Sequence, residues 1–205
     1  MGLKHSYSLL APFYDLVVAK ASQSLRASSL EHLHSITKPE DNILIAGIGT
    51  GLDIPFLGTQ RNYYGIDLTP AMLSRAKKRV QDVSVNFQVG DVMNLPYKNE
   101  SFDAVVMHLI MAVVSNPTAA LQESQRVLKT DGHLIILDKF LKPGQLAPVR
   151  RLFNPLIRQI ATQTNITFEH HIAQCPQLAV VSDEPVLAGG WFRRIHLTKK
   201  TSKNS

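Results

Sequence analysis

The chain has 205 residues, 44% of them hydrophobic, a composition that suits one domain with a sizeable core and excludes a disordered chain or a repeat array. Its formal net charge of +6 is unevenly spread: residues 139–205 carry 10 Lys and Arg against 3 Asp and Glu, whereas residues 41–138 carry 8 against 10. The basic final third is compatible with nucleic acid, an anionic lipid surface, an acidic partner or a solvated face.

The N-terminal part is predicted to be helical. Apolar side chains within residues 6–20 recur at helical spacing, and Pro12 predicts that the helix proper begins near that residue. The segment is amphipathic, and we interpret residues 1–38 as a helical cap that precedes the core. Its apolar positions are Leu9, Leu10, Phe13, Leu16 and Val17.

Residues 42–138 alternate short apolar runs with helical patterns, which is typical of βαβ units on a parallel sheet. Pro70 to Gln81 and Pro117 to Leu128 are predicted helices, because proline is tolerated in a first helical turn. Thr69 and Asn116 are suitable N-caps for them. The predicted strands are Asn42 to Gly47, Asn62 to Ile66, Ser84 to Val89, Phe102 to His108 and Gly132 to Asp138.

The basic final third contains one predicted helix and one predicted hairpin. Residues 146–160 carry an apolar stripe flanked by Arg150 and Arg151, a pattern of a helix that packs on a sheet or lies on a membrane. Leu178 to Leu187 and Gly190 to Leu197 are apolar runs with a short separation, so the last strand is predicted to run antiparallel to its neighbour. Residues 199–205 are interpreted as a polar tail.

A glycine-rich loop follows the first predicted strand directly, with the sequence Gly47-Ile48-Gly49-Thr50-Gly51. Glycines let the backbone turn sharply and approach a ligand closely, with N–H groups at a helix start facing its polar atoms. Leu52 stands where a dinucleotide loop needs Gly or Ala, and no Gly-Lys-Ser/Thr follows, which disfavours both NAD and a phosphate-binding P-loop. The loop suits a nucleoside without a pyrophosphate.

Acidic residues end the next two predicted strands. Asp67 closes Tyr64-Gly65-Ile66-Asp67, where a carboxylate can accept hydrogen bonds from both ribose hydroxyls; the alternative is a charge that complements the following helix dipole. Asp91 can accept from an adenine amine beside Val92, although alone it would be interpreted as a turn residue. Because ligands bind at the carboxyl edge of such sheets, the three motifs together predict an adenosyl site.

In this order the motifs resemble the class I S-adenosylmethionine-dependent methyltransferases: Gly47 to Gly51, Asp67 to Leu73, Gly90-Asp91 and Phe102-Asp103. The resemblance covers residues 40–140. It implies a single α/β domain with a Rossmann-like, doubly wound sheet of seven strands, mostly parallel with an antiparallel C-terminal strand. S-adenosylmethionine is the implied cofactor, S-adenosylhomocysteine its product, and no metal is expected. The implied cofactor contacts are Tyr14, Gly47, Gly49, Thr50, Gly51, Asp67, Leu68, Met72, Asp91, Val92 and His108, with His108 at the mouth of the site.

Two positions depart from the family pattern. Relatives usually carry Asp or Glu two residues before the first glycine, where this chain has Ile45. That removes the usual electrostatic support near the methionyl ammonium, so we expect binding to depend more on Asp67 and Asp91. Thr130-Asp131-Gly132 stands where many relatives have Pro-Gly-Gly, in a turn expected to lie away from the cofactor.

Three further segments resemble small bacterial phosphatidylethanolamine N-methyltransferases and the quinone-methylating branch: Leu10 to Asp15, His108 to Val114, and Gly190 to Arg194. This resemblance implies an N-terminal amphipathic helix that caps the site and touches the membrane. It implies methylation of a lipid amine by a cytoplasmic protein on the inner membrane face.

The resemblance also suggests residues for catalysis and substrate binding. A primary ammonium must lose a proton before it can attack, and Tyr7, Tyr14 and His108 are candidates for that removal. The alternatives are rim packing for the tyrosines and a wall of the cofactor pocket for the histidine. Arg150 and Arg151 are candidate ligands of a lipid phosphate, or exposed side chains without that role.

Other functions remain as alternatives at this stage. A methyltransferase of a quinone or another small apolar molecule would use the same cofactor site, and a non-catalytic cofactor-binding protein on a membrane surface is a different class. Nucleic acid is disfavoured, because no Asn/Asp-Pro-Pro-aromatic signature follows the fourth predicted strand. No run approaches the roughly 20 apolar residues of a membrane span and no signal peptide is present, so an intracellular location is expected. Cys175 has no partner cysteine and is interpreted as a small buried residue.

Overall fold

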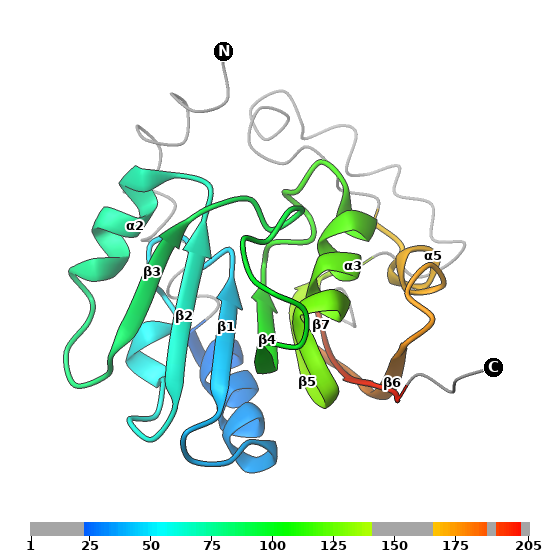
Figure 1. Cartoon of the computed structure of the whole chain (residues 1–205), viewed down its shortest axis with the longest axis horizontal. Coiled ribbons are helices and arrows are strands. Elements are labelled where there is room, and N and C mark those ends of the chain that lie inside the picture. Colours follow the sequence, from blue (N-terminus) through cyan, green and yellow to red (C-terminus); the bar gives the residue numbers. More distant parts are fainter. Residues whose placement is uncertain (1–22, 141–165, 188–191, 202–205) are drawn as a thin grey trace.

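The computed structural model describes residues 23–140, 166–187 and 192–201. Seven strands form one sheet in the order β3-β2-β1-β4-β5-β7-β6 (Figure 1). Neighbouring strands from β3 to β5 pair in parallel, whereas β7 runs antiparallel to both β5 and β6. This arrangement confirms the predicted fold class. The strands are β1 (Asn42–Ala46), β2 (Asn62–Asp67), β3 (Val85–Val89), β4 (Phe102–His108), β5 (Leu128–Lys139), β6 (Leu178–Leu187) and β7 (Phe192–Lys199).

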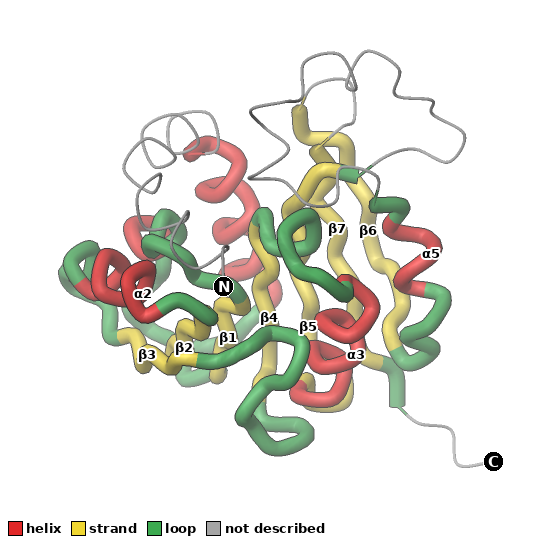
Figure 2. The backbone as a smooth tube through the Cα atoms, turned by 90° about the horizontal axis from the view of Figure 1, so that it is seen from above, coloured by secondary structure: helices red, strands yellow, loops and turns green. Residues whose placement is uncertain are grey.

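Helices cover both faces of the sheet, as the view from above shows (Figure 2). One face carries the helix over residues 23–36, the short helix η1 (Ile54–Phe56) and α2 (Pro70–Lys77). The other carries α3 (Pro117–Val127) and α5 (Phe168–Ile172). None of the helices that the structure describes is long and apolar enough to span a membrane.

The sheet separates two hydrophobic cores, one on each face, because successive side chains along a strand point to opposite faces. In β1, Ile43 and Ile45 pack with Leu30 and Leu33 of the helix over residues 23–36. Leu44 and Ala46 face the opposite way, into the core beneath α3. Because both faces of β1 are buried, the strand has an almost continuous apolar sequence, as expected for the centre of a parallel sheet.

The predicted helix starts are correct, and the ends differ slightly. Asn116 accepts a hydrogen bond from the Ala119 N–H at 3.2 Å, which confirms it as an N-cap. Thr69 occupies the predicted N-cap position of α2, but its side chain makes no cap bond. The helix predicted to reach Gln81 ends at Lys77, because the next residues tighten into i to i+3 hydrogen bonds.

The largest difference in strand bounds is in β5, which begins at Leu128 rather than at Gly132. The segment expected to be a turn is instead a bulge within the strand, with Asp131 at φ 60°. A Cβ on Gly132 would lie 2.9 Å from the Lys129 carbonyl oxygen, so only glycine fits there. The hairpin of β6 and β7 is confirmed, although β7 runs from Phe192 to Lys199, two residues later than predicted.

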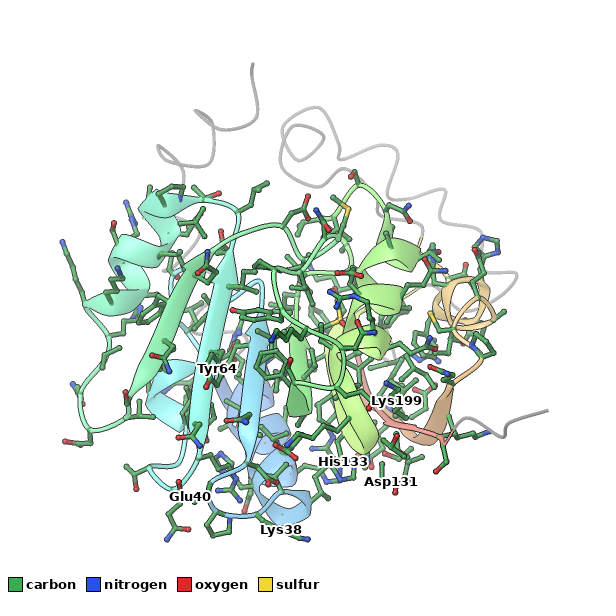
Figure 3. The ribbon with its side chains drawn as sticks, viewed as in Figure 1. Lys38, Glu40, Tyr64, Asp131, His133 and Lys199 are labelled. Carbon is green, nitrogen blue, oxygen red and sulfur yellow. The ribbon has the colours of Figure 1, made fainter. Side chains whose placement is uncertain are left out.

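The edge at the amino ends of the parallel strands carries charged and polar side chains, among them Lys38, Glu40, Asp131, His133 and Lys199 (Figure 3). Cys175 is fully buried, as predicted, and burial raises the pKa of its thiol to about 11. The amphipathic segment predicted over residues 6–20 and the basic helix predicted over residues 146–160 lie outside the described residues.

Candidate active site

The glycine loop leaves the carboxyl end of β1 with left-handed backbone at Gly47 (φ 72°), Gly49 (φ 57°) and Gly51 (φ 82°). A Cβ on Gly47 would lie 2.6 Å from Cδ1 of Ile110, and one on Gly51 would lie 2.9 Å from Cα of Ala76. A Cβ on Gly49 would meet only the Gly47 carbonyl oxygen, at 3.9 Å. Gly49 therefore borders open space, where a ligand can approach the backbone.

Asp67 ends β2 directly beside this loop. Its Oδ2 accepts the Gly49 N–H at 3.0 Å, and its Oδ1 accepts the Thr69 N–H at 2.8 Å. Half-burial raises the pKa of Asp67, while these two backbone N–H groups act against the increase. A carboxylate has about four acceptor positions; the Thr69 side chain also bonds to this one, and what remains is open to the hydroxyls of a ribose.

Asp91 and several apolar side chains lie along the same edge of the sheet. Asp91 Oδ1 accepts the Met93 N–H at 2.8 Å, which fixes the turn after β3. Leu68 is 55% exposed and Val89, opposite Asp67 in the β2–β3 pairing, is 48% exposed. Exposed apolar surface next to two carboxylates suits the faces and edges of an adenosyl group.

The remaining predicted cofactor residues differ in accessibility. Met72 is partly exposed in the first turn of α2. Thr50 and Val92 are buried, each at 6% exposure. The Thr50 carbonyl oxygen accepts the Arg79 Nε–H at 2.9 Å. Direct contact of these residues with a cofactor stays a prediction.

His108 lies at the end of β4 with its side chain fully buried, which corrects the expectation of a ring at the mouth of the site. Its Nδ1 is 2.8 Å from Asp53 Oδ1, and its Nε2 is 2.9 Å from Ser29 Oγ. Arg26 Nη1 donates to the same Asp53 oxygen at 2.8 Å. Since both ring nitrogens are occupied, proton removal by His108, which stays a prediction, would require the Ser29 contact to break.

The Ser29–His108–Asp53 chain has the connectivity of a hydrolase triad, but the surroundings argue against that chemistry. Ser29 is fully buried within the helix over residues 23–36, so its hydroxyl is inaccessible to an acyl group. The carboxylate is also neutralised directly by Arg26. The chain of contacts is therefore interpreted as structural.

A second buried carboxylate lies on the β4–β5 half of the same edge. Asp138 is 1% exposed, and its oxygens accept the N–H groups of Lys139 at 2.7 Å and Ala112 at 3.3 Å. Burial raises the pKa of Asp138 to about 6, although these backbone N–H groups lower it. Asp138 thereby holds the loop that follows β4.

Four predicted residues, Tyr7, Tyr14, Arg150 and Arg151, lie outside the described residues, so their roles stay predictions. A hollow of about 430 Å³ lies elsewhere, lined by residues from 54–59 and 78–83. It contains none of the predicted site residues. We place the site at the strand ends instead, because the open backbone at Gly49, the free acceptor positions of Asp67 and the exposed Leu68 meet there.

Known proteins resemble this chain in sequence and in fold. A methyltransferase domain model matches residues 44–136. A phosphatidylethanolamine N-methyltransferase of Cereibacter sphaeroides is 27% identical over 97% of this chain and 98% of its own length. A demethylmenaquinone methyltransferase of Deinococcus radiodurans is 30% identical over 74% of this chain and 66% of its own length, so the chain spans about two thirds of that relative.

A solved structure from Thermotoga maritima, described as an S-adenosylmethionine-dependent methyltransferase and possible histamine N-methyltransferase, has the same fold. Its TM-score is 0.68 at 22% identity, covering 97% of this chain and 100% of that one. The chain is an S-adenosylmethionine-dependent methyltransferase. Among the described residues of this methyltransferase, no cluster of His, Cys, Asp and Glu is arranged to hold a metal ion.

Sequence reasoning missed three buried groups of the methyltransferase: Arg26, Asp53 and Asp138. Asp53 follows the last loop glycine by two residues, and this acidic residue in an otherwise apolar run was the available signal. Arg26 gave no signal, because its partner is 27 residues away. Asp138 was treated only as the end of a strand.

Gly49→Ala is expected to weaken S-adenosylmethionine binding by the methyltransferase about tenfold. The left-handed backbone costs an L-residue roughly 1 to 2 kcal/mol, and the added methyl group occupies the ligand side of the loop. Isothermal titration calorimetry measures the change. Gly58→Ala is the matched control, since its Cβ would find its nearest neighbour at an ordinary 3.5 Å. Affinity within twofold of wild type for Gly49→Ala would contradict this view of the loop.

Proposed function

We propose that the enzyme methylates the amine of phosphatidylethanolamine and of its partly methylated intermediates at a membrane surface. The observation that carries this proposal is the extent of the Cereibacter sphaeroides match, which takes in 97% of this chain and 98% of that phosphatidylethanolamine N-methyltransferase. The excess of Lys and Arg in residues 139–205 supports an anionic lipid surface as partner. A peripheral position on the cytoplasmic face of the membrane belongs to the same proposal.

The geometry of the described residues is suited to holding the cofactor in one orientation. Asp67 fixes the ribose through its free acceptor positions, and Asp91 with the exposed Leu68 takes the adenine. The open backbone at Gly49 then receives the methionine part. S-adenosylmethionine supplies a methyl group on a sulfonium, and its transfer is an in-line displacement in which alignment provides much of the acceleration.

The acceptor amine has to be neutral before it attacks. Its lone pair forms the new N–CH3 bond while the S–CH3 electrons return to sulfur, and the proton of the former ammonium passes to a base or to water. Tyr7 and Tyr14 are the proposed proton acceptors, because the His108 side chain is buried and both of its ring nitrogens already have partners. Arg150 and Arg151 are the proposed ligands of the lipid phosphate.

A quinone or related apolar molecule is the second candidate acceptor. It is favoured by the identity of 30% with the Deinococcus radiodurans demethylmenaquinone methyltransferase and 29% with a 2-phytyl-1,4-naphtoquinone methyltransferase of Synechococcus elongatus. Those matches include 74% and 75% of this chain. Such a substrate carries no phosphate, so it would not need Arg150 and Arg151.

The experiment is incubation of the purified protein with methyl-labelled S-adenosylmethionine and vesicles of phosphatidylethanolamine, with demethylated quinone vesicles in parallel. We expect label in mono-, di- or trimethylated phosphatidylethanolamine. An Arg150→Ala/Arg151→Ala double variant is expected to lose most lipid methylation. Label in the quinone alone, or equal lipid activity in the double variant, would overturn the proposed substrate or the proposed phosphate ligands respectively.

A further inference from the structure

The glycine loop is tied to two other parts of the fold through one carboxylate. Asp53 stands at the N-cap of η1, two residues after Gly51, yet its side chain does not cap that helix. Instead its Oδ1 accepts a hydrogen bond from Arg26 Nη1, on the helix over residues 23–36, at 2.8 Å. The same oxygen lies 2.8 Å from His108 Nδ1, at the end of β4. These three residues are named the loop anchor.

The proton positions in the loop anchor follow from its chemistry. An ionised carboxylate only accepts hydrogen bonds, so His108 Nδ1 must carry a proton. His108 Nε2 lies 2.9 Å from the Ser29 hydroxyl oxygen, so both ring nitrogens have a hydrogen-bonding partner. Burial alone would raise the pKa of Asp53, but Arg26 and His108 hold it well below its usual range. Asp53 therefore stays ionised, with Arg26 and His108 both directed at its carboxylate.

A hydrogen bond from outside the loop anchor also fixes the glycine loop. Arg79, just beyond α2, donates to the Thr50 carbonyl oxygen at 2.9 Å. The sheet below offers no polar support at Ile45, which is 1% exposed in the core and pairs with Val106, two residues before His108. The buried negative charge nearest the loop in sequence thus comes from Asp53, which follows the glycines.

We propose that Arg26, Asp53 and His108 position the glycine loop for the methionine part of S-adenosylmethionine without touching the cofactor. The proposal rests on the assignment of this loop to the cofactor. The helix over residues 23–36 then acts as the support against which the loop is set. If the loop anchor has this positioning role, changing it weakens the binding of ligands that carry the amino-acid part and spares ligands that lack it. A purely structural role predicts the same loss of affinity for both kinds of ligand.

The test compares two ligands by calorimetry: S-adenosylhomocysteine, and 5′-methylthioadenosine, which lacks the amino-acid part. Asp53→Asn keeps the shape and removes the charge, and we expect at least tenfold weaker S-adenosylhomocysteine binding with less than twofold change for 5′-methylthioadenosine. Arg26→Lys, which keeps the charge, is expected to remain within about threefold of wild type for both ligands.

Asp103→Asn is the matched control. Its carboxylate also joins separate elements, pairing with Lys129 at 2.8 Å and accepting the Asn42 N–H at 2.9 Å, at the start of β4. We expect unchanged affinity for both ligands. If Asp53→Asn fails to fold because the Arg26 charge loses the Asp53 carboxylate, the neutral double variant Arg26→Gln/Asp53→Asn replaces it, with the same selective loss expected.

Equal losses for both ligands, or no loss for either, would overturn the positioning role. Absence of S-adenosylhomocysteine binding by the wild-type protein is a different result, because it would remove the cofactor assignment on which the proposal rests.

Discussion

Asp67→Ala is expected to weaken S-adenosylhomocysteine binding by at least about 100-fold. Two hydrogen bonds from ribose hydroxyls to a carboxylate are lost, and bonds to charged groups contribute about 1.5 to 3 kcal/mol each. The Gly49 and Thr69 N–H groups also lose their acceptor, which loosens the loop. Calorimetry gives the dissociation constant, and thermal unfolding reports whether the variant remains folded.

Two further variants sharpen this expectation. Asp67→Asn keeps one side-chain oxygen without the charge, so its affinity for S-adenosylhomocysteine should lie between those of wild type and Asp67→Ala. Asp82→Ala removes an exposed carboxylate that lines the hollow beside η1, and it should bind normally. Affinity of Asp67→Ala within threefold of wild type, or a large loss in Asp82→Ala, would contradict the site at the strand ends.

Acidification is expected to destabilise the fold through His196. His196 is 5% exposed between two other rings, with its Nδ1 3.3 Å from His32 Nε2 and its Nε2 3.1 Å from His133 Nδ1. Burial, followed by the neighbouring His133, His32 and Arg194, lowers the pKa of His196 to about 4. The unfolded chain binds this proton near pH 6.5, so stability is complete above pH 6.5 and falls toward pH 4.

The size of this effect is about 2 kcal/mol between pH 7.5 and pH 5, taking the folded and unfolded pKa values of His196 as about 4 and 6.5. Asp138 acts in the opposite direction, because its pKa is raised to about 6 and its protonation on acidification favours the folded state. The wild-type profile therefore combines opposing contributions from these and other groups with shifted pKa values, among them His32 and His133. A comparison of variants separates them.

Urea unfolding of wild type and His196→Asn at both pH values is the measurement. The difference in unfolding free energy between them is expected to shrink by about 2 kcal/mol on acidification, since only the wild type has this histidine to protonate. His170→Asn, at an exposed position, should show a constant difference from wild type. An unchanged difference for His196→Asn would contradict the buried, neutral state of His196.

The strands and the cofactor edge were predictable because their signals are local. Apolar runs mark β1 and β4, and three closely spaced glycines permit the left-handed backbone that the loop adopts. Asp67 was recognisable because a strand end fixes where its side chain lies. The order of these motifs along the chain was sufficient to place them at one edge of a parallel sheet.

The features that were not predicted depend on distant pairs. Arg26 and Asp53 are 27 residues apart, and Ser29 and His108 are 79 apart, so no local pattern predicts that they meet. His108 was correctly placed at a strand end, but its burial depends on the helix over residues 23–36. The bulge at Asp131 was similarly hidden, because turn-forming residues also suit an irregularity within a strand.

A crystal structure of the protein with S-adenosylhomocysteine tests the central claim most directly. We expect both ribose hydroxyls within hydrogen-bonding distance of the Asp67 carboxylate and the amino-acid part over Gly49. Adenosyl density away from Asp67, for example in the hollow lined by residues from 54–59 and 78–83, would contradict it.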